Sequence, residues 1–407
     1  MTTVISTSWL SIVGLTAEGE AGLHPAARAA IAAAELVIGS ERQLKLVAAI
    51  TTGATQRWPS PLADGLPALW ARRGRSTCVL ASGDPFWYGI GATLAPQLAP
   101  GEFVCYPAPS SLSLAAARLG WALQDVAVVS LHGRDLHAVI PHLQPQRRVL
   151  ALSWNGQTPS QLAALLRERG LGDSRLHVLE VLGGPEERVR SSLARDYPLG
   201  DVADLNVIGL EVAAERGAFY LPARGSLPDD AFEHDGQLTK RDIRAITLSA
   251  LAPRPGALLW DVGAGSGSIA IEWLLGHPSC RAIAIERDSA RAGRIRRNAS
   301  RLGVPTLQLV EAGAPEGLAG LPTPDAVFIG GGASDPALFA HCWQALRPGG
   351  RLVINAVALA TEALLLQWHA AHGGELCRIA VAHAEALGRH RGWRPAMPVT
   401  QWRVDKP

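Results

Sequence analysis

The sequence predicts an α/β protein of two domains, and three observations support this interpretation. Its 407 residues exceed the usual size of a single domain. Apolar, strand-like runs alternate with helix-like runs in both halves of the chain. The stretch 222–235 contains Pro222 and Pro228 and several acids, and it lacks hydrophobic periodicity, as linkers often do. We therefore expect domains at residues 1–221 and 222–407.

Composition excludes several classes of protein. Hydrophobic residues make up 48% of the chain and charged residues 18%, which is typical of a globular protein with a full core. A formal charge of +2 is too small to argue for a nucleic-acid partner. The start of the chain lacks a signal-peptide pattern, and no apolar stretch has the length of a membrane span. The five scattered cysteines match neither a disulfide framework nor a zinc motif. We expect a cytoplasmic protein that binds neither nucleic acid, membrane nor metal.

In the N-terminal half, strands and helices are predicted in alternation. Strands are expected at 9–14, 36–38, 79–81, 126–131 and 206–212, and helices at 26–34 and 112–120. Two of these strands end in turns of unusual composition. One turn is Ser82-Gly83-Asp84-Pro85, and the other is His132-Gly133-Arg134. Polar turns at strand ends are where α/β domains often place ligand contacts.

In the C-terminal half, a regular series of strand–helix units is predicted. Five strands separated by helices are expected at 257–262, 281–286, 307–311, 325–329 and 351–355. Two further strands, near 374–383 and 397–404, have no helix signal between them and indicate an antiparallel hairpin. Together these elements predict a seven-stranded sheet with helices between its parallel strands.

The most informative segment is the glycine-rich turn that follows the first of these strands. Asp261 precedes Gly263, Gly265 and Gly267, and a helix begins directly afterwards. Glycines let the backbone approach a ligand closely, and the start of a helix offers free amide donors. Glu286 ends the next strand, where an acid can bind the hydroxyls of a ribose. The pattern predicts a nucleoside-cofactor site.

The form Asp-x-Gly-x-Gly-x-Gly resembles motif I of the class I S-adenosylmethionine-dependent methyltransferases. A dinucleotide-binding turn more often has the spacing Gly-x-Gly-x-x-Gly. S-adenosylmethionine carries an ammonium and a sulfonium but no phosphate, so an acid inside the turn suits its charge. The resemblance implies a seven-stranded, Rossmann-like class I fold that uses S-adenosylmethionine. A purely structural strand–turn–helix is the alternative.

The N-terminal half resembles the tetrapyrrole methylases, which have a different, two-lobed α/β fold and also use S-adenosylmethionine. The resemblance rests on residues 12–14, 82–89, 107–111 and 130–134. The loop at 14–19 carries fewer glycines than is common in that family. The resemblance implies cofactor contacts from residues at the ends of these motifs, namely Gly14, Gly83, Asp84, Ser110, Ser111 and Leu131.

The C-terminal half is similar to the decarboxylating precorrin methylases, through residues 238–241, 328–332, 355–357 and 387–390. The whole chain is identified as a member of the bifunctional precorrin methyltransferases of cobalamin biosynthesis. Membership implies methylation of a precorrin-6 tetrapyrrole at carbon 5 by the N-terminal domain and at carbon 15 by the C-terminal domain. It also implies loss of carbon dioxide from the ring C acetate, which gives precorrin-8. One S-adenosylmethionine site per domain, no metal and a homo-oligomer are expected.

The similarity of the C-terminal half to the decarboxylating precorrin methylases also implies roles for residues in that domain. Cofactor contacts are expected from the motif I residues and from Glu286, Gly313, Ala314 and Gly330. Candidates on the substrate side are Thr239, Lys240, Asn355, Arg389 and His390. The last two belong to a basic cluster suited to carboxylates, although a solvated basic face is the alternative. We interpret the basic run at 287–301 as a solvated helix face. No residue is assigned to proton transfer.

Two other functions stay open from the sequence. One is a class I RNA methyltransferase with an accessory domain, which the near-neutral charge and the lack of an Asn-Pro-Pro-Tyr-like or Cys-based catalytic motif argue against. The other is a non-catalytic tetrapyrrole carrier with one decayed cofactor site. The sparse glycines of the loop at 14–19 keep that second alternative open for the N-terminal half.

Overall fold

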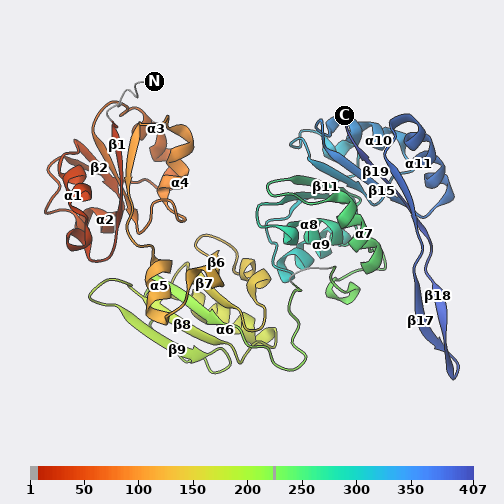
Figure 1. Ribbon diagram of the computed structural model, residues 1–407, viewed down its shortest axis with the longest axis horizontal. Helices are drawn as coiled ribbons and strands as arrows, with labels where there is room; N and C mark the ends of the chain where they lie inside the picture. Colours follow the sequence, from red (N-terminus) through yellow and green to blue (C-terminus); the bar gives the residue numbers. More distant parts are fainter. Residues whose placement is uncertain (1–7, 223–225) are drawn as a thin grey trace. The chain divides into compact units, whose positions relative to one another are not determined.

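The computed structural model describes residues 8–222 and 226–407, and α/β elements run through both halves of the chain (Figure 1). The chain divides into two compact units. One unit contains the residues up to Leu136 and His142–Tyr220, and the other contains His137–Pro141 and Leu221–Pro407. In the described segments, no helix is long and apolar enough to cross a membrane.

The first sheet of the N-terminal unit is parallel throughout. In spatial order its strands are β3 (Ala54–Arg57), β2 (Leu36–Gly39), β4 (Thr77–Ser82), β1 (Leu10–Leu15) and β5 (Phe103–Tyr106). Its helices are α1 (Pro25–Ala32), α2 (Glu41–Leu46), α3 (Leu66–Trp70) and α4 (Ile90–Leu94). Neighbouring residues of β1 belong to different cores, with Ile12 in one and Val13 in the other. Both faces of the sheet are therefore buried, as parallel sheets require.

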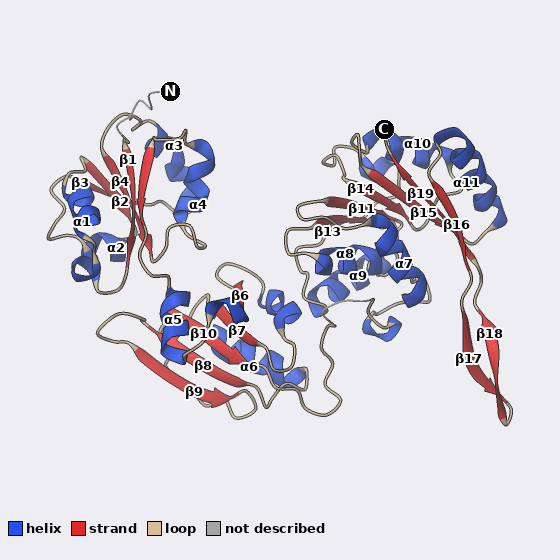
Figure 2. Ribbon diagram, in the orientation of Figure 1, coloured by secondary structure: helices blue, strands red, loops and turns tan. Residues whose placement is uncertain are grey.

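The second sheet of this unit is mixed. In spatial order its strands are β6 (Val126–Ser130), β7 (Arg148–Leu152), β10 (Asn206–Glu211), β8 (Arg175–Glu180) and β9 (Arg188–Leu193). Helices α5 (Ser111–Leu119) and α6 (Thr158–Glu168) accompany it (Figure 2). Leu112, Ala115 and Ala116 of α5 pack into a core with Leu150 and Val207 of the sheet. The predicted two-lobed α/β organisation is confirmed.

The C-terminal unit is built on a seven-stranded sheet, as predicted. In spatial order its strands are β13 (Gln308–Val310), β12 (Arg281–Ile285), β11 (Leu258–Val262), β14 (Ala326–Ile329), β15 (Arg351–Ala356), β19 (Val399–Asp405) and β16 (Glu375–Ile379). The first five are parallel, and β19 is antiparallel to both of its neighbours. Its helices are α7 (Arg241–Leu251), α8 (Ser268–Gly276), α9 (Ser289–Arg301), α10 (Pro336–Ala345) and α11 (Leu359–His372).

The prediction of a single terminal hairpin at 374–383 and 397–404 is wrong in one respect. Strands β16 and β19 do pair antiparallel, but they do not follow one another directly. In the sequence, a separate two-stranded ribbon of β17 (Ala382–Leu387) and β18 (His390–Pro395) comes between β16 and β19. The ribbon extends from the body of its unit (Figure 1). Every residue of β17 is exposed, so the ribbon has no buried face that would produce a recognisable strand pattern.

Candidate functional site

A cavity of about 1040 Å³ opens at the carboxyl ends of the parallel strands of the C-terminal unit. Strand β11 lies between β12 and β14, so the order of the sheet reverses beside β11. Such a reversal leaves a crevice in which open α/β sheets bind ligands. The cavity is lined by most of the residues predicted for this domain, namely Thr239, Lys240, Asp261, Gly263, Gly265, Glu286, Gly313, Ala314, Gly330 and Asn355.

The glycine-rich turn is held between two other backbone segments. At Gly263 φ is +70°, and a Cβ atom there would lie 2.8 Å from the backbone of Gly331. At Gly265 φ is +60°, and a Cβ atom would lie 3.0 Å from the carbonyl oxygen of Gln237. Side chains at either position would both strain the backbone and displace a neighbouring segment. The glycines therefore keep a narrow, backbone-lined cradle at the bottom of the cavity.

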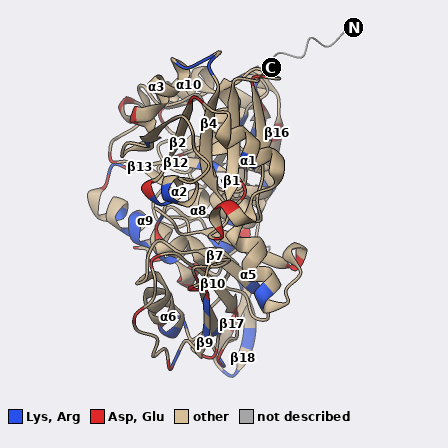
Figure 3. Cartoon of the chain, turned by 90° about the vertical axis from the view of Figure 1, so that its left-hand side faces the viewer, with Lys and Arg blue, Asp and Glu red and all other residues tan. Residues whose placement is uncertain are grey.

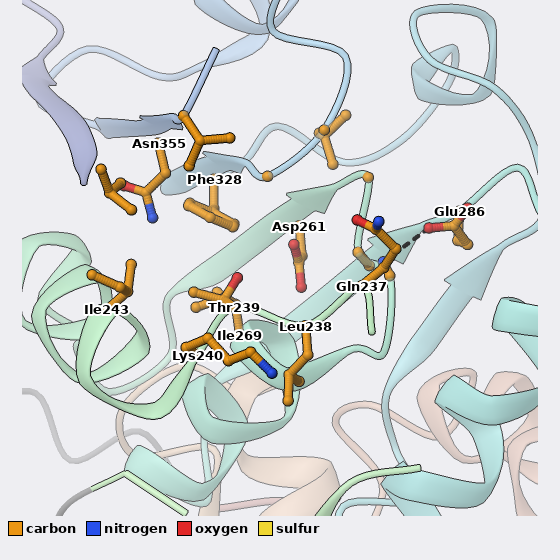
Figure 4. A pocket seen from close by; sticks show the side chains of 18 of the residues that line it. Gln237, Leu238, Thr239, Lys240, Ile243, Asp261, Ile269, Glu286, Phe328 and Asn355 are labelled. Atoms are coloured by element: carbon orange, nitrogen blue, oxygen red, sulfur yellow. Dashed lines mark hydrogen bonds between the residues drawn. The ribbon is translucent and has the colours of Figure 1, made fainter. Parts of the chain in front are cut away.

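Asp261 sits beneath this turn with one carboxylate oxygen unsatisfied. Its side chain is 1% exposed and lines the cavity (Figure 4). Oδ2 accepts a hydrogen bond of 3.0 Å from the Ala270 amide, whereas Oδ1 is buried without a partner. Burial raises the pKa of this carboxyl to about 7, the Ala270 amide lowers it, and the nearby charge of Glu286 raises it further. A buried oxygen that lacks a donor is suited to a cationic ligand group.

Glu286 directly follows β12 and holds the turn from its other side. Its Oε2 accepts a hydrogen bond of 2.8 Å from the Gly265 amide, drawn in Figure 4, and its Oε1 accepts one of 3.0 Å from the Asp288 amide. Each carboxylate oxygen keeps acceptor capacity for a second donor. The side chain is therefore fixed in direction and can still accept hydrogen bonds from two neighbouring hydroxyls.

The segment 226–240 covers one side of the cavity, and a buried arginine anchors it. Arg244 of α7 is fully buried and pairs with Glu272 of α8 at 2.6 Å. It also donates to the Thr239 carbonyl at 2.6 Å and pairs with Asp229 at 3.2 Å. Burial raises the pKa of Glu272, and the charge of Arg244 counteracts that shift. Arg244 thus holds the chain that presents Thr239 and Lys240 to the cavity.

Asn355, at the end of β15, is oriented by two buried side chains. Its Nδ2 donates to Thr247 Oγ1 at 2.8 Å, and its Oδ1 accepts from Gln401 Nε2 at 2.9 Å. Thr247 and Gln401 are 0% and 5% exposed. The amide of Asn355 therefore has a fixed orientation, and one hydrogen of Nδ2 and one lone pair of Oδ1 are not used in these bonds.

The base of the β17–β18 ribbon forms a wall of the cavity that sequence reasoning missed. The lining residues from this region are Val381, His383, Ala396, Met397 and Val399. His383 Nε2 lies 3.1 Å from Asp242 Oδ2 at the start of α7. Apart from their proximity to the predicted basic cluster, these residues carry no local sequence signal. Only the fold brings them to the strand ends.

Three predicted residues lie outside the lining of this cavity. Gly267 directly precedes α8, and a Cβ atom there would lie 3.0 Å from the side chain of Ile295, so this glycine allows close packing against α9. Arg389 and His390 lie at the turn of the ribbon. The functional roles of these three residues, like those of the predicted residues that line the cavity, stay predictions.

The basic run on α9 has a different explanation from the solvated face that we expected. Arginines gather on α9 (Figure 3). Arg291 and Arg294 pair with Asp235, at 3.0 and 2.7 Å, and Arg297 pairs with Glu233 at 2.9 Å. These arginines hold a pocket-lining part of the chain rather than only meeting water.

In the N-terminal unit, three predicted segments meet at the strand ends of the first sheet. A Cβ atom on Gly14 would lie 2.1 Å from the Gly83 carbonyl oxygen and 2.7 Å from the Ala108 amide. Gly83 has φ +64°, and its Cβ atom would lie 3.0 Å from Ser110 Cα. The fold therefore brings Gly14, Gly83 and Ser110 together, although they come from three separate motifs.

The other predicted residues of this unit lie in the turn after β4, at the start of α5 and directly after β6. Asp84 Oδ1 accepts from the Phe86 amide at 2.8 Å, which shapes the turn after β4. Ser110 caps α5 by accepting from the Ser113 amide at 3.1 Å, and Ser111 is the first residue of that helix. Leu131 is buried just after β6. The same turn after β4 presents half-exposed Phe86, Trp87 and Tyr88.

Two family models match this chain, one in each half. Residues 10–197 match the tetrapyrrole (corrin/porphyrin) methylases, and residues 230–406 match the precorrin methyltransferase domain. Both matches agree with the motifs described above. Among known proteins, a precorrin-6Y C(5,15)-methyltransferase [decarboxylating] of Sinorhizobium sp is 54% identical over 98% of this chain and 96% of that protein.

Further relatives cover the whole chain or part of it. The enzyme of the same name from Mycobacterium tuberculosis is 42% identical over 97% of this chain and 99% of that protein. A "probable cobalt-precorrin-6B C(15)-methyltransferase (decarboxylating)" of Pyrobaculum calidifontis is 33% identical over 187 residues, which are 44% of this chain and 94% of that protein. The full-length matches favour a precorrin methyltransferase over the RNA methyltransferase and carrier alternatives.

Proposed function

This chain belongs to the family of decarboxylating precorrin-6Y C(5,15)-methyltransferases, and we propose that its two methylations are divided between its two domains. It methylates precorrin-6Y at carbons 5 and 15 and decarboxylates it in cobalamin biosynthesis, with S-adenosylmethionine as the methyl donor. The N-terminal domain, residues 1–221, is assigned carbon 5. The C-terminal domain, residues 222–407, is assigned carbon 15 and the decarboxylation, giving precorrin-8.

The assignment of carbon 15 to the C-terminal domain has two supports. The Pyrobaculum calidifontis relative, named for carbon 15 and decarboxylation alone, matches a length of chain close to that of the C-terminal family match. That domain also contains the cavity with the unpartnered Asp261 Oδ1. This buried oxygen is the observation on which the proposed cofactor site depends, because a cation must compensate it when the carboxyl is ionised.

The residues of the cavity fit S-adenosylmethionine. Asp261 Oδ1 is placed to accept from its ammonium, and the two oxygens of Glu286 are placed to accept from its ribose hydroxyls. Gly263 and Gly265 line this cavity, and their lack of side chains lets the backbone of Gly331 and Gln237 pack against the turn. The same cavity is lined by Gly313, Ala314 and Gly330. In our proposal Gly313 and Ala314 lie beside the adenine, and Gly330 lies near the methyl group. When bound, S-adenosylmethionine supplies the methyl group.

The substrate side is assigned to the opposite part of the cavity. Thr239, Lys240 and Asn355 line it and are held by the Arg244 and Gln401 contacts described above. A carbon of the reduced macrocycle is itself the nucleophile, so these residues mainly have to hold it in line with the methyl group. Arg389 and His390 remain candidates for substrate carboxylates because of their charge.

A second S-adenosylmethionine site is proposed in the N-terminal domain. Its support is the convergence of Gly14, Gly83 and Ser110 at the carboxyl ends of a parallel sheet, where such folds bind ligands. Asp84, Ser111 and Leu131 belong to the same proposed site. A metal-free reaction, a homo-oligomer and a cytoplasmic location stay predictions. All five cysteines are free, which agrees with a reducing compartment.

Product analysis tests the division of labour. The purified full chain, precorrin-6Y and S-adenosylmethionine should give a product that gains two methyl groups and loses one carbon dioxide by mass spectrometry. Asp261→Ala should leave one added methyl group, at carbon 5, and no decarboxylation. Asp84→Ala should abolish the carbon 5 methyl group. If Asp84→Ala left that methyl group unchanged, or if Asp261→Ala still released carbon dioxide, the division between domains would be wrong.

A further inference from the structure

The decarboxylation requires a proton that none of the assigned residues supplies. When an acetate side chain loses carbon dioxide, the electrons of the broken C–C bond pass into the conjugated ring system. The methylene carbon left behind must then take up one proton to become a methyl group. Methylation of a ring carbon that bears one hydrogen releases one proton as the C=C bond is restored. The two steps therefore balance if one group in the cavity can take up and return a proton.

Most ionisable side chains along the cavity already have other partners. Asp229 pairs with Arg244 and also accepts from the Arg241 amide. Arg291 pairs with Asp235. Asp261 and Glu286 lie at the glycine-rich turn, where they belong to the proposed cofactor site. These groups hold the site together and are poorly placed to serve a reacting macrocycle at the other end.

His383 is the one imidazole among the described residues that line the cavity. Histidine is the side chain that most readily gains and loses a proton near neutral pH, which makes it the commonest acid–base group in enzymes. His383 is the second residue of β17, and its neighbours Val381, Ala396 and Met397 line the same wall. This wall is separate from the glycine-rich turn and belongs to the part assigned to the substrate.

The position of the His383 ring is set by a carboxylate on another element. Nε2 lies 3.1 Å from Asp242 Oδ2, and Asp242 lies in the first turn of α7, directly after the pocket residues Thr239 and Lys240. A carboxylate that holds one ring nitrogen fixes the orientation of the ring, which leaves the other nitrogen for the substrate. The side chain of His383 is 65% exposed and lines the cavity, so the ring is accessible to a bulky ligand.

We propose that His383 is the acid–base catalyst of the C-terminal domain and that Asp242 is its positioning residue. Nδ1 takes the proton released when the C–H bond of the methylated ring carbon breaks. After the C–C bond to the carboxylate has broken and carbon dioxide has left, the same nitrogen returns one proton to the methylene carbon. One methyl group enters and one carbon dioxide leaves, with no other reactant. This inference rests on the proposed function of the C-terminal domain.

The test uses the full chain with precorrin-6Y and S-adenosylmethionine. His383→Ala should lower the rate of decarboxylated product about 100-fold, while carbon 5 methylation continues in the same reaction. Imidazole added to the buffer should restore a measurable part of that rate, because the site is open. Asp242→Asn should lower the rate about tenfold. Glu385→Gln is the matched control: it alters the same strand, outside the cavity lining, and should stay within twofold of the unmodified chain.

The outcomes separate this inference from the proposed function. If the unmodified chain released no carbon dioxide, the proposed function itself would fail. If the unmodified chain released carbon dioxide and His383→Ala formed decarboxylated product at the same rate, the acid–base role would be excluded. A loss of rate that imidazole does not restore would also overturn it, because it would indicate a structural role. Binding of S-adenosylmethionine to His383→Ala, measured by calorimetry, should be unchanged.

Discussion

Single residues in the C-terminal cavity show a conflict between folding and binding, and Asp261 is the clearest case. Its carboxyl is buried, and only one of its two oxygens receives a hydrogen bond. Such an arrangement costs stability in the ligand-free protein and is useful only when a cation compensates it. Residues that are costly to fold and suited to a ligand are typical of functional sites.

This conflict predicts that Asp261→Asn stabilises the ligand-free C-terminal domain at alkaline pH. Burial raises the pKa of Asp261 from 3.8 to about 7 in the folded state, so the folded chain keeps a proton that the unfolded chain has lost. The contribution of the protonated Asp261 carboxyl to the free energy of unfolding is therefore fully present below pH 3.8 and is lost as the pH rises through 7. Between pH 5.5 and 8, the advantage of the variant in free energy of unfolding should grow by about 2 kcal/mol. Denaturant unfolding at several pH values measures this, and a constant difference would contradict it.

Affinity should show the opposite dependence on pH. The ionised carboxylate attracts the ammonium of S-adenosylmethionine, and the protonated form does not. Calorimetric titration should show weaker binding to the C-terminal site as the pH falls below 7, approaching tenfold per pH unit. Asp261→Asn should bind weakly at every pH. Equal affinity of the unmodified chain at pH 6 and pH 8 would mean that Asp261 does not meet the cation.

Glycines illustrate how far spacing alone identifies individual site residues. Gly263 and Gly265 line the cavity, and their position after an apolar strand predicts that they contact the cofactor. Gly267 belongs to the same motif but packs beside Ile295 of α9. Sequence spacing could not separate these two roles, because the packing partner of Gly267 comes from a different helix that is distant in the chain.

At the scale of elements, the segment 226–240 depends on one buried ion pair. Arg244 and Glu272 come from neighbouring helices, and the arginine also contacts Asp229 and Thr239 of the segment. Removing one partner of a buried pair leaves the other charge without compensation, which is far more costly than the loss of an exposed pair.

Arg244→Ala should therefore destabilise the C-terminal domain by about 3–5 kcal/mol, because it leaves Glu272 buried and unpaired. Arg296→Ala is the matched control: its side chain is 58% exposed and pairs with Glu311. That change should cost less than about 1 kcal/mol. Denaturant unfolding of both variants makes the comparison. Similar losses of stability in the two would contradict the anchoring role of Arg244.

The elements that the sequence predicted well are those with a buried, apolar pattern. Strands β11, β12, β14 and β15 are nearly continuous apolar runs, and their predicted bounds differ from the observed ones by one residue at most. The β17–β18 ribbon was missed because all of β17 is exposed and no core selects one face. His383 was missed because it lies on this exposed strand. Its partner Asp242 lies on α7, far away in the sequence, so no local pattern indicated the pair.

At the scale of the whole molecule, we propose that two domains of unrelated fold each bind one S-adenosylmethionine. The parallel sheet of the N-terminal domain brings Gly14 and Gly83 together, and the sheet of the C-terminal domain places Asp261 and Glu286 in one cavity. The motifs of each domain were recognisable because they are local in the sequence. The number of S-adenosylmethionine molecules that one chain binds can be measured only on the complete molecule.

The number of S-adenosylmethionine sites per chain tests this claim most directly. Isothermal titration of the purified full chain, without precorrin substrate, should give two molecules bound per chain. Asp261→Ala and Asp84→Ala should each reduce this to one, and the double variant should bind none. A single site in the unmodified chain, or two sites remaining in either variant, would contradict the proposal that each domain binds its own methyl donor.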